Sequence, residues 1–306
     1  MRATTGIVLL LACLPIPLVA RAACAVEQVV AVPLDIASGT IAVEVAVNGS
    51  AATLILDTGA QRSVVTPAAV QRLRLARDEW AGTAMRGIGG VETRPNADPD
   101  SLTLGGVPLV RRTLKRDISL AVADLPRTHL GTLIIDGLLG RDFLAPFDLD
   151  LDVLRRRLTL YRVNGCGGRF LPWPGDYTAE PVALLADNAV VMPVTVDDTP
   201  LRAILDTGAS ASVIAAPGLF RLGLPPGGLP GDPADPVSGL GPRSVTMHRH
   251  VFRSLRAVGQ TTASPTIQVA PIHTTPIADM LLGADWLADR RVWISFATRQ
   301  VFVAAP

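Results

Sequence analysis

The chain has 306 residues, of which 49% are hydrophobic and 18% are charged. This length and apolar content exclude an intrinsically disordered chain and allow one large domain or two ordinary ones. The formal net charge of +1 gives no electrostatic reason to expect a nucleic acid or an anionic membrane as a partner.

The first 22 residues have the pattern of a secretory signal peptide. Arg2 supplies the positive charge, residues 7–20 are mainly apolar, and residues 20–22 form a small-x-small cleavage site before Ala23. This stretch is too short for a membrane span and is interrupted by two prolines, so we interpret it as a signal peptide and not as a membrane anchor. We expect no membrane span in the mature chain. Lipoprotein anchoring at Cys13 is the less favoured alternative, because the apolar run continues past that cysteine. The sequence predicts an exported protein, periplasmic or secreted.

The rest of the chain consists of two copies of one unit. Residues 54–60 read Leu-Ile-Leu-Asp-Thr-Gly-Ala, and residues 203–209 read Ala-Ile-Leu-Asp-Thr-Gly-Ala. Ser63-Val64-Val65 matches Ser212-Val213-Ile214 at the same offset. After a small change of offset in the intervening loops, Leu138-Leu139-Gly140 and Asp142 match Leu281-Leu282-Gly283 and Asp285. We expect a first lobe at 23–161, a linker at 162–188 and a second lobe at 189–306.

Each unit is predicted to be rich in β-structure. Residues 41–47 have high strand propensity, Asn48-Gly49 favours a type I′ hairpin turn, and the returning strand at 52–56 delivers Asp57 at its end. The second unit repeats this plan at 190–205. Short helices are expected at 67–75, 141–144, 217–222 and 284–288. The predicted fold class is all-β with two similar lobes and few short helices.

Two cysteines remain after the predicted cleavage, Cys24 and Cys166. In an oxidising compartment they form either one disulfide or two unpaired thiols, and the sequence leaves both alternatives open.

The histidines at 248 and 250 are interpreted as structural or surface residues, because no carboxylate or cysteine cluster accompanies them. We therefore expect no metal and no cofactor. The alternation of Asp148, Asp150 and Asp152 with leucines predicts a strand with a solvated acidic face.

The two Asp-Thr-Gly-Ala loops, each followed by an apolar-apolar-glycine segment, resemble the aspartic proteases. Ala60 and Ala209 after the glycines resemble the retropepsin-like branch. The resemblance implies two acid-protease-type β-barrel lobes related by a pseudo-twofold axis. A single chain would supply both lobes, as in the pepsin-like arrangement, so that a monomer suffices.

The resemblance also assigns roles to individual residues. Asp57 and Asp206 would be the catalytic pair and would share one proton, because two adjacent carboxylates do not both ionise readily. Thr58 and Thr207 would bond across to the opposite loop, and Gly59 and Gly208 would allow close approach of the backbone. The Leu-Leu-Gly segments would brace the aspartate loops from behind.

Glycine clusters mark two expected flaps over a bound peptide. Gly87-Ile88-Gly89-Gly90 and Gly239-Leu240-Gly241 follow their respective aspartates at nearly the same interval. The alternative interpretation is a pair of merely exposed loops, since glycine marks loops in general.

The leading functional hypothesis is an exported aspartic endopeptidase that acts on a peptide or protein. The alternative is a non-catalytic two-lobed protein that binds peptide or a cell-envelope partner in the same cleft.

Overall fold

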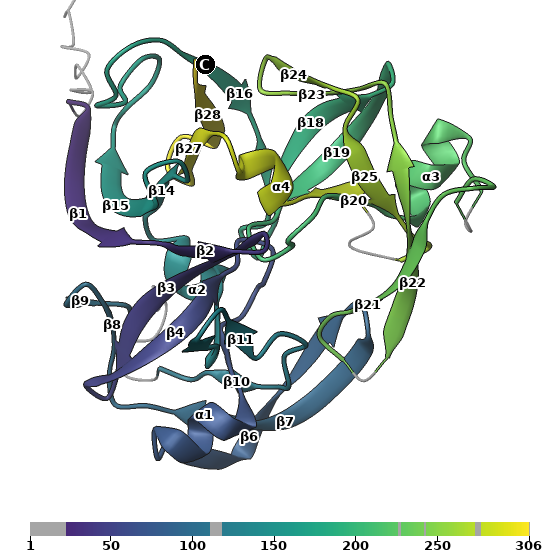
Figure 1. Cartoon of the computed structure of the whole chain (residues 1–306). Coiled ribbons are helices and arrows are strands. Elements are labelled where there is room, and N and C mark those ends of the chain that lie inside the picture. Colours follow the sequence, from purple (N-terminus) through teal and green to yellow (C-terminus); the bar gives the residue numbers. More distant parts are fainter. Residues whose placement is uncertain (1–22, 111–117, 226–227, 242, 273–276, 306) are drawn as a thin grey trace, which may run out of the picture.

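The computed structural model describes residues 23–110, 118–225, 228–241, 243–272 and 277–305 (Figure 1). The predicted signal peptide at 1–22, with Cys13, lies outside the described residues. The described part is mostly β-structure in two similar lobes, which confirms the predicted fold class. Within it, no helix is both long and apolar enough to cross a membrane.

The sheet of the first lobe has the order β10-β5-β13-β4-β3-β8-β9, with β2 beside β3. Its strands are β2 (Asp35–Ala37), β3 (Thr40–Val47), β4 (Ser50–Leu56), β5 (Val64–Val65), β8 (Leu102–Leu104), β9 (Val107–Pro108), β10 (Ala121–Val122) and β13 (Gly137–Leu139). Two further hairpins belong to this half, formed by β6 (Ala76–Gly87) with β7 (Gly90–Asp98) and by β11 (His129–Leu130) with β12 (Leu133–Ile134).

The sheet of the second lobe has the order β21-β22-β25-β20-β26-β19-β18-β23-β24, with β17 beside β18. Its strands are β17 (Ala183–Leu184), β18 (Val190–Val196), β19 (Thr199–Leu205), β20 (Val213–Ile214), β21 (Ala234–Ser238), β22 (Ser244–Val251), β23 (Ser254–Ala257), β24 (Gln260–Ala263), β25 (Thr266–Val269) and β26 (Met280–Leu282). The helices are α1 (Pro67–Arg72), α2 (Arg141–Leu144), α3 (Ala216–Leu222) and α4 (Ala284–Leu287), close to the predicted positions.

Corresponding strands of the two lobes make corresponding pairings. In the first lobe β4 runs antiparallel to β3 and parallel to β13; in the second, β19 runs antiparallel to β18 and parallel to β26. Burial alternates along β4, where Leu54 and Leu56 are fully buried, as expected for a strand with one face in the core. Asn48 and Gly49 both have positive φ, which the predicted type I′ turn requires.

A third sheet joins the lobes. It has six strands in the order β1-β15-β14-β27-β28-β16, namely β1 (Ala25–Pro33), β14 (Asp148–Asp152), β15 (Arg157–Asn164), β16 (Tyr177–Pro181), β27 (Arg291–Ser295) and β28 (Gln300–Ala304). The two halves meet where β14 pairs with β27. The stretch expected as a linker, 162–188, therefore contributes strands to the shared sheet and, through β17, to the second lobe.

The prediction of a solvated acidic face on β14 is wrong. Asp148, Asp150 and Asp152 are each at most 2% exposed. The indole of Trp173, from the expected linker, donates to Asp150 Oδ2 over 3.1 Å, and the guanidinium of Arg291 donates two further bonds of 3.0 and 2.7 Å to the same carboxylate. These partners, distant in sequence, hydrogen-bond the buried carboxylate of Asp150 and compensate its charge.

Candidate active site

Asp57 and Asp206 lie at matching strand ends, where the two lobes face each other. The N–H of Asp57, after β4, donates to Leu139 O over 3.0 Å, and that of Asp206, after β19, donates to Leu282 O over 2.9 Å. The Leu-Leu-Gly strands thus pass beside the aspartate loops, as the resemblance implied. The structure brings together the two residues that the repeat singled out.

Each loop glycine lies against the carboxylate of the opposite lobe. A Cβ added to Gly59 would lie 2.3 Å from Cγ of Asp206, and a Cβ added to Gly208 would lie 2.3 Å from Cγ of Asp57. Both distances are far below any real contact between carbon atoms. Close approach of the two carboxylates therefore requires glycine at both positions.

Thr58 and Thr207 lock the loops together through four hydrogen bonds. The N–H of each threonine donates to the hydroxyl oxygen of the other, over 3.0 and 3.1 Å. Each hydroxyl in turn donates to a carbonyl of the opposite lobe, Thr58 to Leu205 O over 2.8 Å and Thr207 to Leu56 O over 2.6 Å. All four bonds are buried, and all four cross between the lobes.

Backbone donors orient the carboxylates. The N–H of Ala60 donates to Asp57 Oδ1 over 2.7 Å. The N–H groups of Gly208 and Ala209 both donate to Asp206 Oδ1, over 2.9 and 3.1 Å. Oδ1 of each carboxylate is thus held by its own loop.

Burial raises the pKa of both carboxyl groups. The pKa of Asp57 is raised to about 8, first by burial and then by the negative charge of Asp206. The pKa of Asp206 is likewise raised by burial, against hydrogen bonds from its loop and from the Asp57 carboxyl. Because the groups are coupled, the proton belongs to the pair and not to one residue. Such a pair holds one proton while its other member is ionised.

Sequence reasoning gave no role to a second layer beneath each loop. Ser63 donates its hydroxyl to Asp142 Oδ1 over 2.7 Å and accepts the N–H of Gly140 over 2.8 Å. Ser212 makes the same two bonds, to Asp285 over 2.7 Å and from Gly283 over 3.0 Å. The signal was present in the sequence, because each serine and aspartate occurs in both repeats. This layer ties each Leu-Leu-Gly strand to the segment after the Asp-Thr-Gly loop.

The two expected flaps meet at their tips. Gly89, between β6 and β7, donates its N–H to Leu240 O over 3.0 Å, and the N–H of Arg243 donates back to Gly89 O over 3.2 Å. Leu240, between β21 and β22, packs against the apolar cluster around Met85 in the first lobe. Ile88 packs against the apolar cluster of the second lobe. Figure 1 shows β7 beside β21, where the two hairpins converge.

The remaining flap glycines lie at the same meeting point. A Cβ on Gly87 would lie 2.4 Å from Leu240 O, one on Gly239 would lie 2.2 Å from a side-chain carbon of Ile88, and one on Gly241 would lie 2.5 Å from the carbonyl carbon of Gly89. Gly90 and Gly241 also have positive φ. Glycine therefore permits the close contact between the tips.

A disulfide lies apart from the aspartate pair. Of the alternatives left open for the cysteines, the structure has this bond, with Cys24 and Cys166 joined over 2.07 Å beside the shared sheet. Among the described residues, no group of three or more histidines, cysteines and acidic residues is placed to hold a metal ion.

A two-lobed all-β fold with one Asp-Thr-Gly loop from each lobe defines an aspartic-protease-type protein. The sequence matches the aspartyl protease family over residues 43–143 and 192–286, more than half of the chain and once in each lobe. The chain therefore belongs to the aspartyl protease family, as the resemblance predicted.

Individual relatives agree with this assignment. The chain is 32% identical over 131 residues to Pol polyproteins of equine infectious anemia virus, in strain Wyoming and in isolate 1369. That match covers 42% of this chain but only 10% of the length of the polyproteins. The crystal structure of the aspartic proteinase from Irpex lacteus superposes with a TM-score of 0.52 and 12% identity, and covers 92% of this chain and 97% of its own. At this identity the structural likeness shows a shared fold.

Proposed function

We propose that the protein is an exported aspartic endopeptidase, with Asp57 and Asp206 as its catalytic pair. The observation that carries the proposal is the threonine lock: four buried hydrogen bonds between the lobes hold the two Asp-Thr-Gly loops together. This geometry favours a peptide or protein as the substrate, because an extended backbone can pair with hairpin tips. Both lobes come from one chain, so the proposal needs only a monomer.

The geometry supports general acid–base catalysis. The ionised member of the pair takes a proton from a water molecule held between the carboxylates, and the water oxygen attacks the scissile carbonyl. The protonated member donates a hydrogen bond to that carbonyl oxygen as negative charge develops on it. When the tetrahedral intermediate collapses, its C–N bond breaks, and the carboxyl group that took the proton from water gives a proton to the departing amine. Neither a metal ion nor a covalent intermediate takes part in this sequence.

Export is the second half of the proposal. It is supported by the signal-peptide pattern at the N-terminus and by the disulfide between Cys24 and Cys166, since disulfides persist in oxidising compartments. The periplasm and the extracellular medium both satisfy this requirement. Fractionation of expressing cells, with N-terminal sequencing of the mature protein, distinguishes export from retention and should find Ala23 as the first residue.

The catalytic proposal is tested by peptide cleavage. A mixed peptide substrate is incubated with the wild type, Asp57→Asn and Asp206→Asn from acid to neutral pH, and the products are identified by mass spectrometry. We expect the wild type to cleave internal peptide bonds and to be inhibited by a pepstatin-type compound. The cleavage rate of each variant should fall by about a thousandfold or more, which is the order of magnitude that general acid–base catalysis contributes. Full activity in either asparagine variant would exclude the pair as the catalytic centre. Peptide binding by the wild type without cleavage would favour the non-catalytic alternative.

A further inference from the structure

The two lobes differ at the residue that follows the Leu-Leu-Gly strand. It is Arg141 in the first lobe and Ala284 in the second. The two backbones are equivalent, because the N–H of Arg141 donates to Ala60 O over 3.0 Å and that of Ala284 donates to Ala209 O over 2.8 Å. The pseudo-symmetry is therefore broken by the side chain alone.

The guanidinium of Arg141 is buried, and each of its three nitrogens donates a hydrogen bond. The side chain is 3% exposed, and its Nη1 donates to the carbonyl oxygen of Thr58 over 2.6 Å. Its Nε donates to Asp187 O over 3.1 Å, and its Nη2 pairs with Asp187 Oδ2 over 2.7 Å. Asp187 lies in the turn that leads into β18. One rigid, planar cation thus ties the loop of Asp57 to the first long strand of the second lobe.

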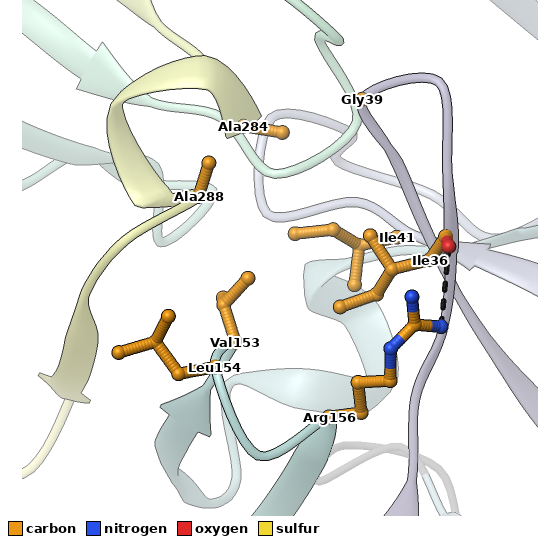
Figure 2. Close-up of a pocket in the computed structure, with 8 residues that line it drawn as sticks. All are labelled: Ile36, Gly39, Ile41, Val153, Leu154, Arg156, Ala284 and Ala288. Carbon is orange, nitrogen blue, oxygen red and sulfur yellow. Dashed lines mark hydrogen bonds between the residues drawn. The ribbon is translucent and has the colours of Figure 1, made fainter.

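The equivalent place in the second lobe has no such clamp. Ala284 and Ala288 instead line a cavity of about 310 Å³, together with Ile36, Ile41 and Val153. Figure 2 shows the one arginine at this cavity, Arg156, with its guanidinium turned toward Ile36, whose carbonyl it meets at 3.3 Å. The carbonyl oxygen of Thr207, which corresponds to that of Thr58, receives no arginine donor in the described part of the chain.

The position of Arg141 also matters electrostatically. Its positive charge lowers the pKa of both Asp57 and Asp206, against the effect of burial. Asp187, from the turn before β18, is the carboxylate that pairs directly with the guanidinium, and the charge of Arg141 also acts on the carboxyl groups of Asp57 and Asp206. Asp142, next in the chain, turns to Ser63 and pairs with Arg62, whose Nε lies 3.7 Å from Asp142 Oδ2.

We propose that Arg141 is a positioning residue for the aspartate pair, which clamps the Asp57 loop, and not its counterpart, to the second lobe and holds a positive charge near both carboxyl groups. This inference rests on the proposed function, in which the pair does the chemistry. It follows that Arg141 sets the pH range over which the pair holds a single proton. A positive charge favours the ionised form, so its loss moves that range to higher pH.

A carboxyl titration tests the inference without turnover. The Asp57 and Asp206 carboxyl carbons are followed by ¹³C NMR against pH in the wild type, Arg141→Gln, Arg141→Lys and Ala284→Arg. We expect Arg141→Gln to move the titration of the pair to higher pH, because loss of a positive charge disfavours the ionised form. Arg141→Lys retains the charge and should titrate close to the wild type. Ala284→Arg places a guanidinium in the empty cavity and should move the titration downward.

Activity gives a second readout. The pH profile of kcat/KM should move in the same direction as the carboxyl titration, with kcat lowered and KM little changed in Arg141→Gln. Arg156→Gln is the matched control, since it removes an exposed arginine at the cavity, and should leave both profiles unchanged. Should Arg141→Gln fail to fold, Arg141→Met, which keeps the unbranched aliphatic stem but not the charge, takes its place with the same expected upward shift.

Superimposable titrations in the wild type, Arg141→Gln and Ala284→Arg would overturn the role of Arg141. An inactive wild type would contradict the proposed peptidase function instead, and the NMR titration would still decide the role of Arg141.

Discussion

Thr58 and Thr207 each accept the N–H of the other on the hydroxyl oxygen, over 3.0 and 3.1 Å, and each then donates that hydroxyl to a backbone carbonyl of the opposite lobe. Neither Asp-Thr-Gly loop is complete without this reciprocal pair. The position of each aspartate is therefore a property of both lobes.

Thr58→Val should destabilise the protein and impair catalysis. Valine keeps the shape but removes the hydroxyl, which leaves the N–H of Thr207 and the carbonyl of Leu205 buried without these partners. Each orphaned group costs about 1–3 kcal/mol. Urea denaturation should show the loss in the free energy of unfolding, and Thr58→Ser, which retains the hydroxyl, should show little. Equal stability of the valine and serine variants would contradict the lock.

Gly59→Ala should abolish activity with a smaller effect on folding. The added methyl group would overlap the Asp206 carboxylate, and relief of the overlap would push the aspartates apart. Overpacking of this kind costs about 1–3 kcal/mol. The matched control is Gly167→Ala, where the new methyl group meets nothing within 4 Å. Cleavage of a fluorogenic peptide by Gly59→Ala at a rate near that of the wild type would refute the close approach.

Stability should fall as pH rises through the range of the dyad. The pKa of Asp57 is raised from its ordinary 3.8 to about 8, so the native state binds a proton that the unfolded state has lost. The stabilisation is complete below about pH 4 and is lost progressively up to about pH 8. Asp57→Asn should flatten this part of the profile of unfolding free energy against pH. The same slope in both proteins would contradict a raised pKa at Asp57.

Reduction of the disulfide should destabilise the shared sheet. The bond between Cys24 and Cys166 closes a sequence separation of 142 residues, and removal of a native disulfide typically costs about 2–5 kcal/mol. Urea denaturation of a Cys24→Ser, Cys166→Ser double variant should show a loss of this size. The control is the wild type treated with reductant, which should match the double variant. Unchanged stability in both would show that β1 is held by its strand pairing alone.

The sequence predicted most where the chain repeats itself. Alignment of the two halves singled out Asp57, Asp206 and their threonines, because equivalent residues in equivalent strands face the same environment. The two flap tips were predicted from glycine clusters at nearly the same interval after each aspartate. The burial of Asp150 was missed, since its partners Trp173 and Arg291 are distant in sequence and only tertiary packing brings them together. Arg141 was missed for the opposite reason: its counterpart is Ala284, so the repeat gave no signal there.

One chain supplies both aspartates of the proposed catalytic pair to a single site. The most direct measurement is a mixing experiment, in which the inactive Asp57→Asn and Asp206→Asn variants are combined after joint unfolding and refolding, and peptide cleavage is measured. Each chain then carries only one of the two aspartates. We predict that the mixture stays as inactive as either variant, while wild type refolded alongside regains its cleavage rate. Recovery of about a quarter or more of the wild-type rate in the mixture, the order of magnitude expected if two chains assemble each site at random, would contradict the account.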